Sequence, residues 1–186
     1  MGAHRTPPPP APRGRPVNAA VGLPARRDER LGAAHLPGLL ALEESGFSPR
    51  ERWSGRSWTS ELARPGNLAL GVYSGEQLVA AGIIGVLFGD AELLRIVVAP
   101  AHRGRGLATG LLARLLAAAA VAGARRMLLE VRHDNTPALA LYERAGFTRT
   151  GVRANYYGPG ADALLMQAVV TPPDTNRPGA AEGGRS

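Results

Sequence analysis

Hydrophobic and polar residues follow two kinds of periodicity along the chain. Stretches such as residues 91–98 (AELLRIVV) and 126–132 (RMLLEVR) are short and rich in Leu, Ile and Val, which is typical of buried strands. Residues 33–45 instead repeat their leucines with helical spacing. The pattern predicts strands at about 23–29, 67–73, 77–87, 91–98, 126–132, 148–157 and 162–170. It predicts helices at about 33–45, 57–63, 105–122 and 136–145.

The resulting order, βααβββαβαββ, predicts one mixed α/β domain over about residues 21–171. Residues that favour helix ends support these boundaries. Gly123 follows the third predicted helix as a C-cap, and Gly146 follows the fourth. Asn135 or Thr136 is suited to cap the start of the fourth helix.

Both ends of the chain lack this pattern. Residues 1–20 contain six prolines, and residues 172–186 are also polar and rich in Pro and Gly, so both are expected to be disordered tails. The first residues form no apolar leader. The longest apolar run, residues 106–124, carries Arg114 near its middle, which favours a helix of a soluble domain over a membrane span. We therefore expect a cytoplasmic protein that makes no membrane contact.

Composition narrows the possible chemistry. Of the 186 residues, 45% are hydrophobic, none is cysteine, and all 22 basic residues are arginine. These absences exclude disulfides, thiol nucleophiles, lysine Schiff bases and P-loop NTPases. The four scattered histidines predict no metal site. The net charge of +7 suits a polyanionic ligand.

A glycine-rich turn follows the predicted strand at 91–98. Residues 103–106 (RGRG) lead directly into a helix, whose first N–H groups lack partners and whose dipole favours an anion. The turn is therefore a candidate phosphate-binding site; the alternative is a turn in which the glycines serve packing alone. A dinucleotide-binding fingerprint fits poorly, because the third glycine, Gly110, comes one residue late.

Two residues in apolar surroundings are candidates for acid–base chemistry. Glu130 alternates with apolar residues in its strand, and a partly buried carboxylate can act as a base. The alternative is a structural ion pair with Arg132 or another arginine. Tyr142 lies among leucines on a predicted helix, where a core role is the alternative. Asn135 is equally explained as a helix cap.

Three segments, taken in order, resemble the GNAT superfamily of N-acetyltransferases. The R-x-x-G-x-A motif at residues 103–108 resembles the turn with which this superfamily binds the pyrophosphate of acetyl-CoA. Residues 128–147 (LLEVRHDNTPALALYERAGF) and 153–157 (RANYY) resemble the ribosomal-protein-alanine N-acetyltransferase (RimI-type) family. The resemblance covers about residues 22–170. It implies a GNAT fold, in which a mostly antiparallel sheet with one splayed parallel strand pair is flanked by helices.

The resemblance also implies a role for individual residues. Glu130 would accept the proton of the amine, and Tyr142 would donate one to the leaving thiolate. Acetyl-CoA would be the co-substrate, with no metal, and would be bound by Ile96, Val97, Val98, Arg103, Gly104, Arg105, Gly106, Leu107, Ala108, Thr109 and Asn135. The acceptor would be bound by Phe47, Trp53, Arg153, Tyr156 and Tyr157.

The implied function is acetylation of the N-terminal alanine of a small-subunit ribosomal protein by direct attack of the amine, without direct contact to nucleic acid. An α-amino group, with a pKa of about 7.7–8.0, needs only modest help to lose its proton. Two alternatives stay open. One is acetylation of a small amine such as an aminoglycoside or polyamine, although segments 47–54 and 153–157 carry one acid, Glu51, and several arginines. The other is a non-catalytic basic module that binds nucleic acid.

Overall fold

The computed structural model describes residues 26–171; both predicted tails, residues 1–20 and 172–186, lie outside this range. The described chain follows the predicted order of strands and helices. The strands are β1 (Arg26–Leu31), β2 (Asn67–Ser74), β3 (Gln77–Leu87), β4 (Asp90–Val98), β5 (Arg126–Arg132), β6 (Thr148–Arg153) and β7 (Ala163–Val169). The helices are α1 (Leu36–Gly46), α2 (Gly55–Ala63), α3 (Leu107–Val121) and α4 (Thr136–Arg144), with short 3₁₀ turns at Ala33–His35 and Pro100–His102.

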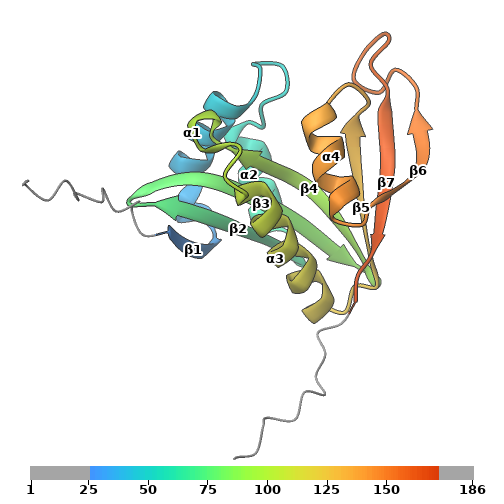
Figure 1. Ribbon diagram of the computed structural model, residues 1–186. Coiled ribbons are helices and arrows are strands. Elements are labelled where there is room, and N and C mark those ends of the chain that lie inside the picture. The colour runs from blue at the N-terminus through green and yellow to red at the C-terminus, as the bar shows by residue number, and fades with distance from the viewer. Residues whose placement is uncertain (1–25, 172–186) are drawn as a thin grey trace, which may run out of the picture.

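The seven strands form one sheet in the order β1-β2-β3-β4-β5-β7-β6 (Figure 1). Neighbouring strands are antiparallel except for β4 and β5, which run parallel and are joined through α3. The predicted mixed α/β fold with one parallel strand pair is therefore confirmed.

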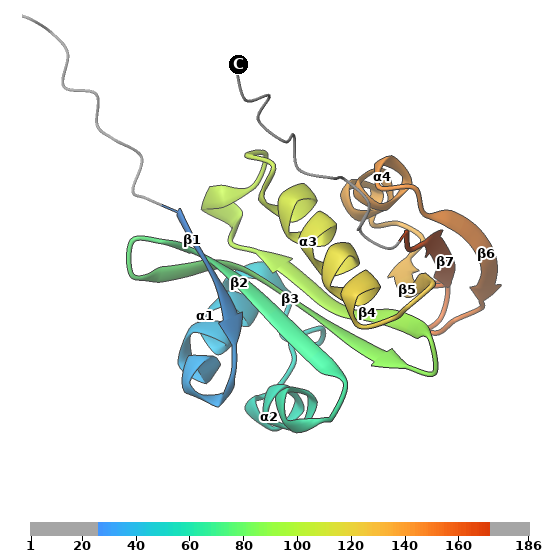
Figure 2. The same ribbon diagram turned by 90° about the horizontal axis from the view of Figure 1, so that it is seen from below.

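Helices cover both faces of the sheet. Figure 2 shows α3 and α4 on one face and α1 and α2 on the other. Each face has its own core: Leu111, Leu112 and Leu115 of α3 are almost completely buried on the first, and Leu39 and Trp58 on the second. Burying these side chains stabilises the domain by about 1.5–3 kcal/mol each. The two faces are thus separate environments divided by the sheet.

A bulge interrupts β4 in its middle. Ile83 of β3 pairs with Arg95 and Ile84 pairs with Leu93, so Leu94 is the extra residue. The parallel ladder between β4 and β5 covers only Asp90–Glu92 of β4, which lies just before the bulge. A bulge bends its strand and increases the local twist. Beyond it, β4 stays with β3 while β5 pairs with β7, and the two parallel strands diverge into a wedge (Figure 1).

The structure corrects several predicted boundaries. The first strand was predicted at 23–29, but the described strand is Arg26–Leu31; residues 23–25 lie outside the described range. The third helix begins at Leu107 rather than at residue 105, because Gly106 has a positive φ of 76° and cannot belong to the helix.

The sixth strand is shorter than predicted. It ends at Arg153 instead of reaching residue 157, because Asn155 takes a left-handed conformation with φ 55°. The N–H of Asn155 donates to Asp162 Oδ1 at 2.8 Å, and the N–H of Gly160 donates to Asn155 Oδ1 at 2.7 Å. These contacts close a turn in place of the predicted strand end.

Candidate active site

The glycine-rich turn before α3 leaves its backbone open on one side. Gly104 and Gly106 have φ values of 73° and 76°, and a Cβ atom added at either position would meet nothing within 4 Å. Among residues 26–171, the N–H groups of 105–109 have no hydrogen-bond acceptor; the first bonded amide of α3 is that of Gly110, which donates to Gly106 O at 2.9 Å. A helix N-terminus of this kind binds anions through backbone N–H groups, so the turn fits a pyrophosphate.

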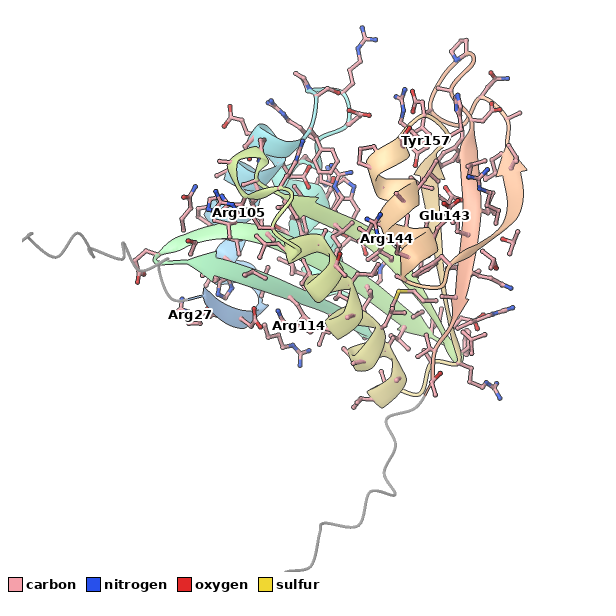
Figure 3. All side chains as sticks on the ribbon, viewed as in Figure 1. Arg27, Arg105, Arg114, Glu143, Arg144 and Tyr157 are labelled. Atoms are coloured by element: carbon pink, nitrogen blue, oxygen red, sulfur yellow. The ribbon has the colours of Figure 1, made fainter. Side chains whose placement is uncertain are left out.

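The two arginines of this turn have different surroundings. Arg103 donates from Nε to Val98 O and from Nη2 to Gly46 O, each at 3.1 Å. It therefore ties the end of β4 to the end of α1, a bracing role that the sequence did not indicate. Arg105 is exposed and lies at the N-terminal end of α3 (Figure 3).

The second half of β4 borders the wedge. Val97 is buried in the core on the α1–α2 face, whereas Ile96 and Val98 pack partly against the core on the α3 face. The ladder with β5 stops at Glu92, so the edge of this half that faces β5 has no strand beside it. This edge is where a backbone amide is available for an extended ligand arm or an oxyanion.

Glu130 is held by an arginine from another part of the chain. Arg153 Nη1 lies 2.6 Å from Glu130 Oε1, and the Glu130 side chain is 26% exposed. The ion pair that we considered as an alternative is therefore present, with Arg153 as its partner. Arg132 instead contacts Asp134 at 2.7 Å and Glu51 at 3.5 Å.

Tyr142 is buried on α4 and packs at 5.7 Å from the ring of Phe147. Burial raises the pKa of Tyr142 to about 12. The charge of Arg95, which lies on β4, opposes this increase in pKa. Tyr142 therefore keeps its proton throughout the physiological range.

Glu130 and Tyr142 belong to opposite faces of the sheet. Val131, next to Glu130, is part of the core beneath α3 and α4, as is Tyr142. Because side chains alternate along a strand, Glu130 points to the α1–α2 face. Burial raises the pKa of Glu92, and the negative charge of Glu130 adds to this increase, which agrees with both carboxyls lying on that face.

Aromatic residues lie near Glu130. Burial raises the pKa of Tyr157, and the charge of Glu130 is the next largest cause. The rings of Tyr156 and Tyr157 pack edge to face at 5.0 Å, and Arg153 lies over Tyr156 at 4.1 Å. Figure 3 shows Tyr157 beside α4, across the diverging strands from Arg105.

The loop between α1 and α2, residues 47–54, lies on the α1–α2 face and is called the acceptor loop because the sequence predicts that it contacts the acceptor. Its predicted residues Phe47 and Trp53 both contact Arg95, whose guanidinium is 3.6 Å from the centre of the Phe47 ring and 5.5 Å from that of Trp53. Sequence reasoning missed Arg95 and its buried partner Glu43. The available signal was a charged residue with apolar residues on both sides in a strand, the same signal that indicated Glu130.

Asn135 caps α4, because its Oδ1 accepts from the N–H of Ala138 at 3.3 Å. The cap leaves the amide nitrogen of its side chain for other contacts. Within residues 26–171, no group of three or more His, Cys, Asp or Glu side chains is placed to hold a metal ion. None of the helices in that range combines the length and apolar character needed to cross a bilayer.

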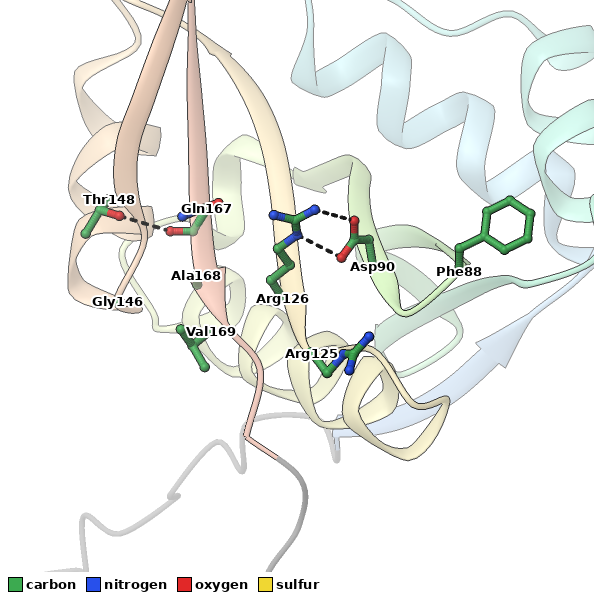
Figure 4. A pocket seen from close by; sticks show the side chains of 9 residues that line it. All are labelled: Phe88, Asp90, Arg125, Arg126, Gly146, Thr148, Gln167, Ala168 and Val169. Carbon is green, nitrogen blue, oxygen red and sulfur yellow. Dashed lines mark hydrogen bonds and ion pairs between the residues drawn. The ribbon is translucent and has the colours of Figure 1, made fainter.

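A surface hollow of about 520 Å³ lies at the other end of β4 and β5 (Figure 4). Asp90 and Arg126, the first residues of the two strands, form a two-bonded ion pair in its wall, at 2.7 and 2.8 Å. None of the predicted site residues lines this hollow. It is therefore separate from the wedge.

The sequence matches a family model described as "Acetyltransferase (GNAT) family" over residues 37–147. It is 40% identical over 131 residues to the N-alpha-acetyltransferase RimI of Mycobacterium tuberculosis, covering 68% of this chain and 81% of that protein. It is equally similar to an uncharacterised Mycobacterium leprae protein, but spans only 36% of that protein's length.

More distant relatives carry more specific names. The chain is 37% identical over 98 residues to the [ribosomal protein bS18]-alanine N-acetyltransferase of Escherichia coli K12, covering 51% of this chain and 66% of that one. The crystal structure of the ribosomal-protein-S18-alanine N-acetyltransferase from E. coli superposes with a TM-score of 0.73 at 27% identity, covering 82% and 98% of the two chains. A Thermoplasma acidophilum N-acetyltransferase solved with coenzyme A shares the fold, with a TM-score of 0.67 at 19% identity.

Proposed function

The chain belongs to the acetyltransferase (GNAT) family and is an acetyl-CoA-dependent N-acetyltransferase, and on this premise we propose that it acetylates the N-terminal alanine of a small-subunit ribosomal protein. Similarity to relatives named as bS18-alanine N-acetyltransferases supports this acceptor. The observation that supports the proposal is that the β4–β5 ladder ends at Leu128, just before Glu130, with Tyr142 in the core on the opposite face of the sheet.

The coenzyme fits the α3 side of the wedge. The unpaired amides of residues 105–109 and the open glycines Gly104 and Gly106 would hold the pyrophosphate. The free edge of residues 96–98 would bind the pantetheine arm, and the side-chain amide of Asn135 would add a contact. Acetyl-CoA supplies the acetyl group as a thioester.

The chain's own residues would move two protons. Glu130, oriented by Arg153, would accept a proton from the acceptor ammonium on the α1–α2 face, directly or through water. A strand amide among residues 96–98 would stabilise the oxyanion. As the C–N bond forms and the C–S bond breaks, Tyr142 would offer its hydroxyl proton to the departing sulfur. The second proton lost by the nitrogen would return to the Tyr142 oxygen, directly or through water. Since the pKa of Tyr142 is about 12, its hydroxyl is protonated whenever the amine can react.

A comparison of acceptors tests the proposal. We expect a synthetic peptide that begins with Ala to be acetylated by the purified protein with a kcat/KM well above that for spermidine. A polycationic acceptor would favour an acidic site, whereas segments 47–54 and 153–157 carry one acid, Glu51, against Arg50, Arg52 and Arg153. A preference for spermidine would support the small-amine alternative and contradict the proposed acceptor.

A further inference from the structure

Glu43 is the only charged side chain among residues 26–171 that is buried, with 1% exposure. It lies on α1 and both of its carboxylate oxygens bond Arg95 of β4, with Nε 2.9 Å from Oε1. Oε2 also accepts the backbone N–H of Trp53 at 3.0 Å. Bidentate contacts between a guanidinium and a carboxylate are strong and fix the orientation of both side chains. Glu43 therefore links a helix, a strand and the acceptor loop.

Arg95 holds the acceptor loop at several further points. Its Nη2 donates to Glu51 O at 2.7 Å, and its guanidinium lies against the Phe47 ring at 3.6 Å and near the Trp53 ring at 5.5 Å. The side chain is only 14% exposed. The loop's middle, residues 48–52, is exposed to solvent, so these contacts with Arg95 and Glu43 anchor it from beneath.

The place of Arg95 in its strand connects this loop to the wedge. Arg95 is the first residue after the bulge at Leu94, and residues 96–98, which border the wedge, follow it directly. The part of β4 that follows the bulge therefore both fixes the position of the acceptor loop, through Arg95, and faces the proposed coenzyme site, through residues 96–98. Buried ion pairs add little net stability compared with apolar residues of the same volume, so stability alone does not explain this pair.

We propose that Arg95, held by Glu43, is a positioning residue that fixes the acceptor loop across the mouth of the wedge and thereby determines which amines reach Glu130. This inference rests on the proposed function for the direction of acceptor entry. Arg95 also covers the face of Phe47, where a second ammonium group of a polyamine, which the peptide terminus lacks, would otherwise bind by cation–π attraction. The pair thus favours a peptide terminus over a polyamine.

The variant Arg95→Lys tests the proposal, because lysine keeps the positive charge but lacks the planar guanidinium that bonds a carboxylate through two N–H groups. We expect the KM for an Ala-initiated peptide to rise on the order of 10- to 100-fold, while the Kd for acetyl-CoA stays within about twofold. The double variant Glu43→Gln/Arg95→Met removes both charges without leaving one buried alone. It should show the same change in KM and a higher ratio of spermidine to peptide acetylation.

A second readout needs no acceptor. The loop contains Arg50 and Arg52, which are trypsin sites, and mass spectrometry can follow cleavage after each of them. Cleavage there should accelerate in Arg95→Lys relative to cleavage after the exposed Arg105. The matched control is Arg126→Lys, which alters a similar two-bonded pair with Asp90 at the far end of the same strands; both readouts should stay at wild-type values.

The results separate this inference from the proposed function. If the wild type prefers spermidine, the proposed acceptor is wrong, and the inference is then judged by trypsin cleavage and by the KM for spermidine. The inference is overturned if Arg95→Lys leaves loop cleavage and acceptor KM unchanged. It is also overturned if acetyl-CoA affinity falls in parallel with acceptor affinity, since that indicates a merely structural role.

Discussion

At the scale of single residues, the surroundings of Glu130 are assembled from distant parts of the chain. Arg153 approaches it from the end of β6, and Tyr157 from the turn that follows. The Tyr157 contact depends on that turn, in which Asn155 adopts a positive φ. The candidate base is therefore oriented by the end of a distant strand, while its own strand supplies its position.

We expect Glu130→Gln to lower kcat/KM for an Ala-initiated peptide by about 100-fold or more at pH 7. The Kd for acetyl-CoA, measured by calorimetry, should not change, because Glu130 lies on the face opposite α3. Activity should recover as the pH rises above about 8, where the α-amine loses its proton without help. Glu143→Gln, which alters an exposed carboxylate paired with Arg149, is the control. A near wild-type rate in Glu130→Gln would contradict the assigned role.

Tyr142 gives the protein a stability that depends on pH. Its pKa is about 12 in the folded protein against 10.0 as its ordinary value, so the folded state favours the protonated form. Because the pKa is higher in the folded state, the contribution of Tyr142 to the unfolding free energy is complete below pH 10 and is lost as the pH rises towards 12. Between pH 9 and pH 11, wild type should lose about 1 kcal/mol more unfolding free energy than Tyr142→Phe does. Urea unfolding at the two pH values measures this; equal losses would show that Tyr142 does not titrate as described.

At the scale of elements, periodicity was enough to predict every strand and helix of residues 26–171 in order, but not the contacts that shape the site. The bulge at Leu94 follows another leucine, Leu93, so the sequence does not show which residue is the extra one. The partners of Glu130 and Arg95 come from elements 23 and 52 residues away, a separation at which hydrophobic patterning carries no information on pairing. Local signals such as the caps at Asn135 and Gly123 were recognised because each acts within one turn.

The junction of α1 and β4 tolerates no added volume. A Cβ atom at Gly46 would lie 2.6 Å from Val97 Cγ2, and Gly46 O is also the acceptor for Arg103. Gly46→Ala should therefore cost about 1–3 kcal/mol of unfolding free energy through overpacking. It should also weaken acetyl-CoA binding, since Val97 and Arg103 border the coenzyme side.

Gly110→Ala is the matched control for this prediction. Gly110 lies in α3, and a Cβ atom there would meet nothing within 4 Å. Alanine should stabilise the coenzyme-free protein by about 0.5–1 kcal/mol. Urea unfolding of both variants provides the comparison; equal stabilities of Gly46→Ala and the wild type would show that α1 can move away from β4 without cost.

At the scale of the whole molecule, two halves of the sheet are joined by one short ladder and share the core beneath α3 and α4. Strands β1 to β4 with α1, α2 and α3 form the first, and β5 to β7 with α4 form the second; between β4 and β5 the ladder pairs only three residues of each strand. The proposed coenzyme site takes its groups from both halves. Binding should therefore tie them together and stabilise the protein by mass action, by about 2.7 kcal/mol at a concentration 100 times the Kd.

Hydrogen exchange can locate this effect. Acetyl-CoA should slow exchange in residues 104–110, in 94–98 and at the start of α4 near Asn135, because the first two segments carry amides without partners. Exchange in β1 and β2, which lie away from the wedge, should not change. Protection confined to β1 and β2 would place the coenzyme elsewhere.

The separation of Glu130 and Tyr142 by the sheet has a kinetic consequence. On the proposed assignment, the polypeptide arrives through one side of the molecule and the nucleotide through the other. Neither the polypeptide nor the coenzyme then blocks the exit of the other, so coenzyme A can be replaced by acetyl-CoA while a large acceptor is still bound. We expect steady-state kinetics in which either substrate can bind first and both bind together in a ternary complex. The turnover rate should not fall as the polypeptide that carries the acceptor's N-terminus becomes larger.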